Sequence, residues 1–172
     1  MIEAEHFASQ EIADRISDTA ARIERIQEKK KERQSTLKDA VQFHHFILES
    51  DELSGWVEEK QNVCLEQDYL DFTNLQGKLQ KHEIFENELN SNHDRVEYLE
   101  DIGAKMMDNQ HYASNDIKAI LDKISESWTS LLETCQHKKQ KLEEAYNEML
   151  YNRGVSDLEN WLAEIEVGII VS

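Results

Sequence analysis

The sequence contains no proline and only five glycines among its 172 residues. At a typical usage of roughly 5%, a chain of this length would contain about 8 prolines. Because an interior proline breaks an α-helix, its absence favours long helices and argues against folds that are rich in turns. Tight turns and phosphate-binding loops both need glycine, so the scarcity of glycine argues the same way. We therefore predict an all-α protein.

Cysteines and long apolar stretches are also scarce. Cys64 and Cys135 are the only thiols and no CxxC motif is present, so we expect no disulfide framework and a reducing cytoplasm as the default location. The start of the chain is acidic and lacks the apolar core of a signal peptide. The apolar run at 167–171 is far shorter than the roughly 20 residues of a membrane helix, so we expect no membrane insertion.

Positive charge is in short supply as well. The chain carries 19 Lys and Arg residues against 36 Asp and Glu residues, which gives a formal net charge of −17. Such a charge repels phosphate backbones and anionic lipids, so we expect no nucleic-acid partner.

What the sequence does contain is an internal repeat. The segment 6–12, His-Phe-Ala-Ser-Gln-Glu-Ile, returns as His-Tyr-Ala-Ser-Asn-Asp-Ile at 111–117, which is 105 positions later. The same offset, without insertion or deletion, relates further pairs: Leu37 and Leu142, Ala40 and Ala145, Leu53 and Leu158, Trp56 and Trp161. The regular register indicates a tandem array of similar units.

Each copy carries a heptad pattern with spacings that alternate between four and three. In the second copy these positions are Ile117, Leu121, Ile124, Trp128, Leu131, Cys135, Lys138, Leu142, Ala145 and Met149. In the first copy they are Ile12, Ile16, Thr19, Ile23, Ile26, Lys30, Arg33, Leu37, Ala40 and His44. A seam of this length predicts a helix that buries one face against others. Polar residues in the middle of the first seam weaken it.

Two further helices are predicted between these seams. Apolar spacing indicates a helix over about 73–108, which starts at a capping box formed by Thr73 and Gln76. A shorter helix over about 47–65 carries a seam of Leu53, Trp56, Lys60 and Val63. The segments 66–72 and 108–112 are expected to be loops. Ser9 and Ser114 are expected to cap the helices that follow them, each with an acidic residue in the first turn.

This map predicts three domain segments. Residues 1–46 form the last helix of a preceding unit, residues 47–152 form a complete three-helix unit, and residues 153–172 form the first helix of a following unit. The stretch 40–56 contains no helix breaker until Gly55, so we expect one unit's last helix to continue into the next unit's first. The second joint contains Gly154, which weakens a helix by about 1 kcal/mol relative to alanine, so we expect this joint to bend more readily.

A period near 106 residues, three heptad helices per unit and tryptophans in the first and third helices resemble the spectrin repeat. The matching motifs are Leu-Ser-Gly-Trp at 53–56, Asn-Leu-Gln at 74–76, Leu-Gln-Lys-His-Glu at 79–83, Gln-His-Tyr-Ala-Ser at 110–114 and Trp-Thr-Ser-Leu-Leu at 128–132. The segments at 68–69 and 80–83 are more similar to the α chain of spectrin than to the β chain. Ile23, at the position of Trp128 in the first copy, departs from the pattern.

The resemblance implies a spectrin-repeat three-helix coiled-coil bundle, set in a tandem array with continuous helical linkers. It implies a structural segment of a flexible rod in the actin-associated membrane cytoskeleton, located in the cytoplasm beneath membranes. The implied partners are a spectrin β-type chain, paired laterally and antiparallel, and actin through the parent complex. The alternative is a docking array in a signalling or junctional scaffold of the plakin, dystrophin-like or Rho exchange factor type. Open apolar seams at both ends also favour self-association.

The conspicuous side chains are interpreted first as structural. We predict a core that includes Trp56, Leu79, His82, Leu89, Trp128, Leu131, Leu142 and Trp161. The adjacent His44 and His45 point about 100° apart on a helix and no HExxH motif is present, so we expect no metal site. No catalytic residue and no cofactor is predicted, and paired acids carry no signal in a chain with 36 of them. We expect no enzyme.

Two basic clusters occupy nearly corresponding places in the two copies. They are Lys29, Lys30 and Lys31 in the first copy, and Lys138, Lys139 and Lys141 in the second. The first interpretation is that they offset acids on neighbouring helices, where an exposed pair adds at most about 1 kcal/mol. The alternative is a patch that binds an acidic partner or anionic lipid, and it is the best-motivated interaction surface in the sequence.

Overall fold

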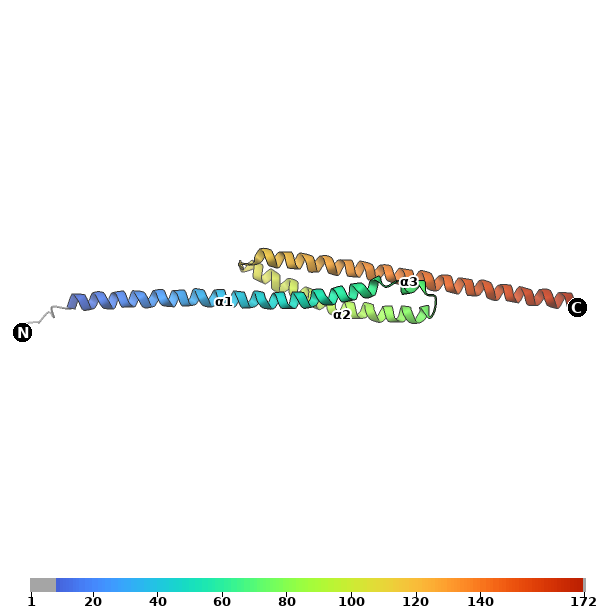
Figure 1. The fold of residues 1–172 in the computed structure, drawn as a ribbon, viewed down its shortest axis with the longest axis horizontal. Coiled ribbons are helices and arrows are strands. Elements are labelled where there is room, and N and C mark those ends of the chain that lie inside the picture. The colour runs from blue at the N-terminus through green and yellow to red at the C-terminus, as the bar shows by residue number, and fades with distance from the viewer. Residues whose placement is uncertain (1–8, 172) are drawn as a thin grey trace, which may run out of the picture. The chain divides into compact units, whose positions relative to one another are not determined.

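In a computed structural model, the structure describes residues 9–171, which form three long α-helices and one short 3-10 helix. Helix α1 spans Ser9–Leu65, the 3-10 helix η1 spans Asp68–Leu70, α2 spans Leu75–Asp108 and α3 spans Ser114–Val171 (Figure 1). Within these residues no strand occurs. The predicted all-α three-helix fold is confirmed. No helix in this described range has the length and apolar character that a membrane-crossing segment needs.

Two compact units divide the chain, Met1–His45 and Phe46–Ser172. In the first unit, every side chain from residue 10 to residue 38 is exposed. The second unit contains the bundle, in which residues 46–65 of α1 lie beside α2 and α3 (Figure 1). The domain boundaries at 46 and 152 stay a prediction.

Helices that follow one another along the chain run in opposite directions in the bundle. Glu52 on α1 pairs with Arg95 on α2, whereas Lys60, further along α1, pairs with the earlier Glu88, so these helices are antiparallel. α2 and α3 are joined by a tight turn at 109–113 and are also antiparallel (Figure 1). Near the η1 end, Leu75, Leu142 and Ala145 form a core cluster against which Tyr69 and Leu79 pack.

The heptad positions predicted for α3 and the apolar face of α2 lie on the inside of this bundle. Along α3, each of the ten positions from Ile117 to Met149 is buried or half-buried. Along α2, the buried residues are Leu75, His82, Leu89, Val96, Leu99, Gly103 and Met106. Gly103 permits a close approach of the helices, since a Cβ there would lie 2.7 Å from Cδ1 of Leu121.

The predicted seam of the first bundle helix needs correction. The buried residues are Phe46, Ser50, Leu53, Val57 and Cys64, whereas Val63 is exposed and Trp56 is half-buried. In a heptad, the seam residue after Leu53 can lie either three positions later, at Trp56, or four positions later, at Val57. The prediction took Trp56, whereas in the structure Val57 faces the partner helices, so the seam is shifted by one residue.

The predicted helix starts also differ from the structure in detail. Asn74, not Thr73, caps α2: it adopts φ 50° and its side chain accepts a bond from the Gly77 N–H at 3.3 Å. Thr73 instead donates from its N–H and its hydroxyl to Asp71. These bonds, with a further one from Lys78, lower the pKa of Asp71 to about 2.

At the start of α3, Ser114 is the first helical residue and its hydroxyl donates to the carbonyl of His111 at 2.6 Å. The capping acceptor is His111, whose Nδ1 accepts from the Ala113 N–H. The predicted cap at Ser9 depends on a side chain that lies outside the described residues. Both α1 and α3 are uninterrupted through the predicted joints near 46 and at Gly154.

Candidate functional site

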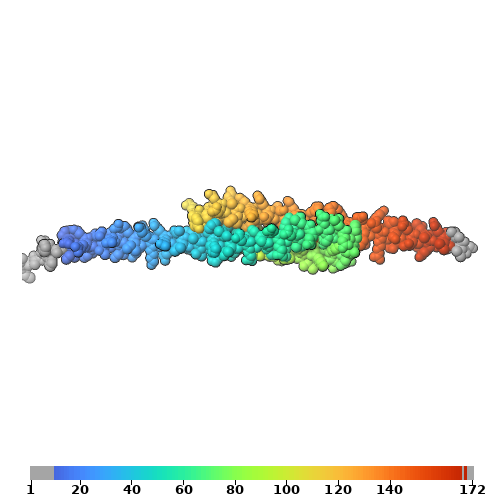
Figure 2. All heavy atoms as spheres, in the orientation of Figure 1, coloured from blue at the N-terminus to red at the C-terminus, as the bar shows by residue number. Residues whose placement is uncertain are grey.

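The predicted core residues do not share one environment. Those that lie buried in the bundle are His82, Leu89, Trp128, Leu131 and Leu142. Leu79 and Trp56 are half-buried at its edge. Trp161 is 55% exposed, so its prediction as a core residue is wrong for this structure. It lies on the last part of α3, which no other segment covers on the face shown in Figure 2.

An aromatic stack joins the three helices at mid-bundle. Trp56 on α1 lies 6.2 Å from Trp128 on α3, and His93 on α2 lies 5.8 Å from the same Trp128, measured between ring centroids. Lys60 Nζ lies over the Trp56 ring, 5.5 Å from its centroid. Because each ring comes from a different helix, the stack favours one axial position of each helix relative to the other two.

A buried polar cluster lies further along the bundle. His82 Nε2 on α2 is 3.1 Å from the carbonyl oxygen and 3.6 Å from the Sγ of Cys135 on α3. Cys64 on α1 is the second buried thiol of the bundle. Interaction with the Cys64 thiol and burial raise the pKa of Cys135, whereas interaction with Cys135 and nearby Lys138 lower the pKa of Cys64. Both thiols are free and buried.

This convergence was missed in the sequence. Cys135 was predicted as a heptad position, but the sequence does not show that it meets Cys64, because the two cysteines lie on different helices. The corrected seam of α1 would have put Cys64 inside the bundle beside the predicted seam residue Cys135. Both thiols are only 4% exposed, which favours a structural role over nucleophilic chemistry.

Lys138 is the central departure from the predicted basic patch. Its side chain is 7% exposed, its ammonium donates to the carbonyl of Val63 at 2.9 Å and it lies 3.1 Å from Asp68. The carbonyl belongs to the last turn of α1, where helical partners are missing. Lys138 therefore caps the C-terminal end of α1 and is not part of an exposed interaction patch.

The other basic residues divide between the two interpretations. Lys139 binds Glu86 on α2 at 2.9 Å and Lys141 binds Glu144 on its own helix at 2.6 Å. Each acid raises the pKa of its lysine by hydrogen bonding to the charged form. Lys29, Lys30 and Lys31 are all exposed on α1. Whether these three bind a partner stays a prediction.

Ion pairs at the bundle surface connect the helices further. Lys60 lies 2.7 Å from Glu88, and Arg95 lies 3.0 Å from Glu52. Gln61 on α1 donates to Thr134 on α3 at 2.9 Å. The exposed Arg95–Glu52 pair adds little stability, but together with the half-buried Lys60 it favours one register between helices that could otherwise slide by a heptad.

The geometry defines a class of protein: a three-helix coiled-coil bundle with two of its helices extended beyond the packed part. The family described as "Spectrin repeat" matches residues 41–144, and the chain belongs to this family. The resemblance found in the sequence is therefore confirmed. Members of the family are structural proteins, and a spectrin-like structural role follows for this chain.

Three curated relatives show how the similarity is distributed. The chain is 31% identical over 166 residues to the mouse "Spectrin alpha chain, erythrocytic 1", which covers 96% of this chain and 7% of the relative. It is 33% identical over 135 residues to the human "Spectrin beta chain, non-erythrocytic 5", which covers 78% of this chain and 4% of the relative. A Drosophila melanogaster "Spectrin beta chain" is 22% identical over 99% of this chain and 7% of its own length. The chain thus spans less than a tenth of each of these relatives.

Proposed function

We propose that this chain is a structural segment of a spectrin-like flexible rod in the actin-associated membrane cytoskeleton, in the cytoplasm beneath a membrane. The observation that carries the proposal is that two helices continue beyond the residues that match the family model. Residues 41–144 match the repeat, while α1 begins at Ser9 and α3 ends at Val171 without a break. Helices that leave a bundle unbroken are suited to pass force to the next bundle.

The mechanism is mechanical. A continuous helix transmits bending and torsion because each turn is hydrogen-bonded to the next. The bundle between the joints has a core of modest size, made of narrow heptad seams, and its unfolding would lengthen the chain under load. Refolding would restore the length, which gives elasticity. Length, elasticity and lateral chain pairing are the contributions that we propose for this segment.

The experiment that tests elasticity is repeated stretching of the single chain, attached at its two ends, in an optical trap. We expect residues 46–149 to unfold in one cooperative step at low force and to refold when the force is released, cycle after cycle. Extension without a cooperative step, or unfolding that does not reverse, would contradict the proposal.

Pairing is the second part of the proposal. The relatives named as α and β spectrin chains support pairing between spectrin-family chains in general. The partner that we propose is a spectrin β-type chain, paired laterally and antiparallel, with actin bound through the parent complex. The exposed apolar residues on the extended helices also favour self-association: Ile12, Ile16, Ile23, Trp161 and Ile165. Light scattering over a concentration series distinguishes self-association from pairing with a β-type chain, if the chain is measured first alone and then with a β-type segment. A constant monomer mass in both series would contradict pairing by this segment.

A docking array in a plakin, dystrophin-like or Rho exchange factor type of scaffold is the second candidate. It is favoured by the exposed Lys29, Lys30 and Lys31, which could bind an acidic surface. The full-length protein distinguishes the two candidates. An exchange domain or plakin module in the same polypeptide would support the scaffold, and further repeats on both sides would support the rod.

A further inference from the structure

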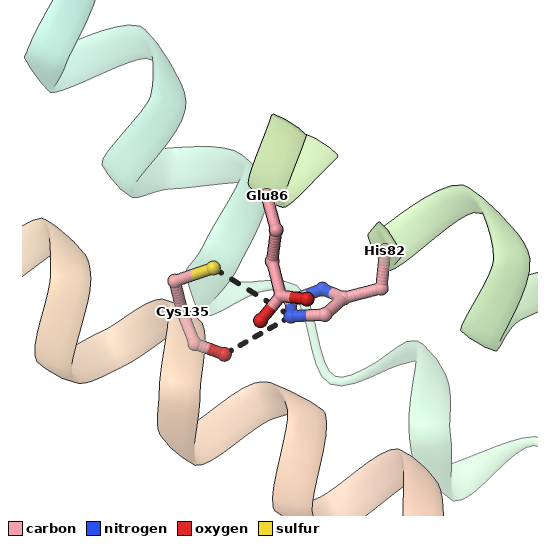
Figure 3. A group of neighbouring side chains, drawn as sticks. All are labelled: His82, Glu86 and Cys135. Carbon is pink, nitrogen blue, oxygen red and sulfur yellow. Dashed lines mark hydrogen bonds between the residues drawn. The ribbon is translucent and has the colours of Figure 1, made fainter. Parts of the chain in front are cut away.

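A groove of about 780 Å³ runs between α2 and α3 and has a mixed polar and apolar lining. His82, Glu86, Cys135 and Lys139 are among its lining residues. His82 and Glu86 are four residues apart on α2 and therefore lie on the same face of that helix. Cys135 faces them from α3 (Figure 3). Three different kinds of metal-binding side chain thus meet at one point of the groove.

Their spacing fits a single ion. One nitrogen of His82, one carboxylate oxygen of Glu86 and the Sγ of Cys135 all lie within 4.8 Å of one another. A tetrahedral zinc ion lies about 2.0–2.1 Å from a histidine nitrogen, about 2.0–2.2 Å from a carboxylate oxygen and about 2.3 Å from a thiolate sulfur. Donors at this separation reach one ion with side-chain adjustments alone. The helices that carry the donors do not need to move apart.

We infer that His82, Glu86 and Cys135 form a binding site for a divalent cation of the zinc type, which would link α2 to α3. Imidazole and thiolate are ligands for zinc and neighbouring transition metals, whereas calcium and magnesium prefer oxygen. His82 and Cys135 are 6% and 4% exposed, so these donors are held in place by packing. Three protein ligands leave a fourth position for water from the open groove.

Binding requires the existing contacts of all three ligands to be exchanged. The His82 ring would give up its contacts with the carbonyl oxygen and the Sγ of Cys135, and the Cys135 thiol would turn from Cys64. Glu86 would turn from Lys139, whose Nζ lies 2.9 Å from it. The Cys135 S–H bond breaks and a Zn–S bond forms, with the proton released to solvent. Lys139 is 38% exposed and can turn outward. The net charge of −17 favours the approach of the cation.

A bound ion would add a cross-link between α2 and α3 that forms and breaks as the ion binds and dissociates. Metal bound to the folded bundle but not to the unfolded chain stabilises the bundle in proportion to the logarithm of its concentration. Because α2 and α3 must separate when the bundle opens, a bound ion would raise its resistance to unfolding. The site does not depend on the proposed place of the chain in the cytoskeleton.

Cobalt(II) is a suitable probe, since a tetrahedral cobalt site with a thiolate ligand absorbs in the visible and near ultraviolet. Titration of the reduced full chain should give one bound Co²⁺ with a sulfur-to-cobalt charge-transfer band, and one equivalent of Zn²⁺ should displace it. The thermal midpoint of unfolding should rise with added Zn²⁺. A wild-type chain that gives no thiolate band, or binds only through exposed histidines, would overturn the assignment.

Matched variants assign the ligands. Cys135→Ser should abolish the charge-transfer band and Glu86→Gln should weaken Co²⁺ binding at least about tenfold. Glu83→Gln removes a neighbouring acid of the same groove and should bind as the wild type does. Cys64→Ser removes the thiol beside Cys135 and should keep the charge-transfer band, because Cys64 is not a ligand. Far-UV circular dichroism checks that each variant folds. If Cys135→Ser does not fold, the half-buried Glu86 still tests the site. Equal affinity in Glu86→Gln and Glu83→Gln, or loss of the band in Cys64→Ser alone, would contradict the ligand set.

Discussion

The two copies of the heptad seam have similar sequence patterns, but the second copy is buried in the bundle and the first is exposed. Trp128 in α3 is 6% exposed, whereas Ile23 at the same position of the first copy is 50% exposed. Leu142 is 1% exposed and its counterpart Leu37 is 58% exposed. The pattern therefore predicts a helix and the face that it could bury. Burial itself depends on partner helices, which for α3 come from 46–65 and 75–108.

This difference also separates two sources of helix stability. The helices of the bundle are stabilised by packing, as most protein helices are. Residues 10–38 have no buried side chain and therefore depend on helix propensity and on continuity with a nucleated helix. Substitutions can therefore remove either the packing of the second copy or the helical continuity of the first.

The largest effect is expected at Trp128. Trp128→Ala removes the ring that stacks on Trp56 and His93, and should lower the free energy of unfolding by about 3–5 kcal/mol. Trp128→Phe should cost less, because the indole N–H has no hydrogen-bond partner among the described residues. Urea denaturation followed by circular dichroism measures both. The matched control is Trp161→Ala, which should change stability by less than about 0.5 kcal/mol. Similar losses in the two alanine variants would contradict the contrast.

Continuity is tested next at His44, an exposed residue of α1 just before the bundle. His44→Pro should weaken the helix there by about 3 kcal/mol, since proline removes a backbone hydrogen bond and clashes with the preceding turn. Residues 10–43 would then lose their nucleus and much of their helical signal, while the bundle keeps its unfolding midpoint. NMR chemical shifts and far-UV circular dichroism report both. His44→Ala is the control and should keep the signal; equal helicity in the two variants would contradict the account.

Lys138 and Arg33 occupy the same heptad position in the two copies. Lys138→Ala should destabilise the bundle by about 2 kcal/mol, because it leaves the carbonyl of Val63 without its charged donor and Asp68 without its cation. Arg33→Ala removes an exposed side chain and should change stability by less than about 0.5 kcal/mol. Chemical denaturation measures both variants. Equal effects would show that Lys138 acts only as a surface charge.

The smallest effect is expected at the glycines. Gly154→Ala adds a methyl group in open space on α3 and should stabilise the local helix by about 1 kcal/mol, which slower amide exchange around residue 154 would show. Gly103→Ala gains the same propensity but brings its Cβ to 2.7 Å from Cδ1 of Leu121, so its gain should be smaller or reversed. A larger gain at Gly103 than at Gly154 would contradict the close packing of α2 on α3.

Much of the fold could be predicted from the sequence because heptad spacing is a local signal. The seams of α2 and α3 and the long uninterrupted helices followed from it directly. The seam of 46–65 did not, because spacings of three and four are both allowed from Leu53 and only the partner helices decide between them. The cap of α2 was missed because Asp71 engages Thr73 before the helix begins, which leaves Asn74 to cap it.

The polar cluster could not be predicted for a related reason. Cys64, His82 and Cys135 lie on three different helices, and their meeting depends on the rotation of each helix about its axis. A one-residue error in the seam of α1 turns Cys64 away from the others. Lys138 was recognised as a seam residue but grouped with its exposed neighbours, because lysine at a seam position gives no sequence signal for the carbonyl that it binds.

Hydrogen exchange, read residue by residue on the full chain at a concentration where it is monomeric, tests the contrast between the two seams most directly. The account predicts that amides of 117–149 exchange only through global unfolding of the bundle, whereas those of 10–43 exchange through local opening at a far smaller free energy. Equal protection of the two segments in the monomer would contradict it, because the first copy would then have a source of stability other than continuity with the bundle.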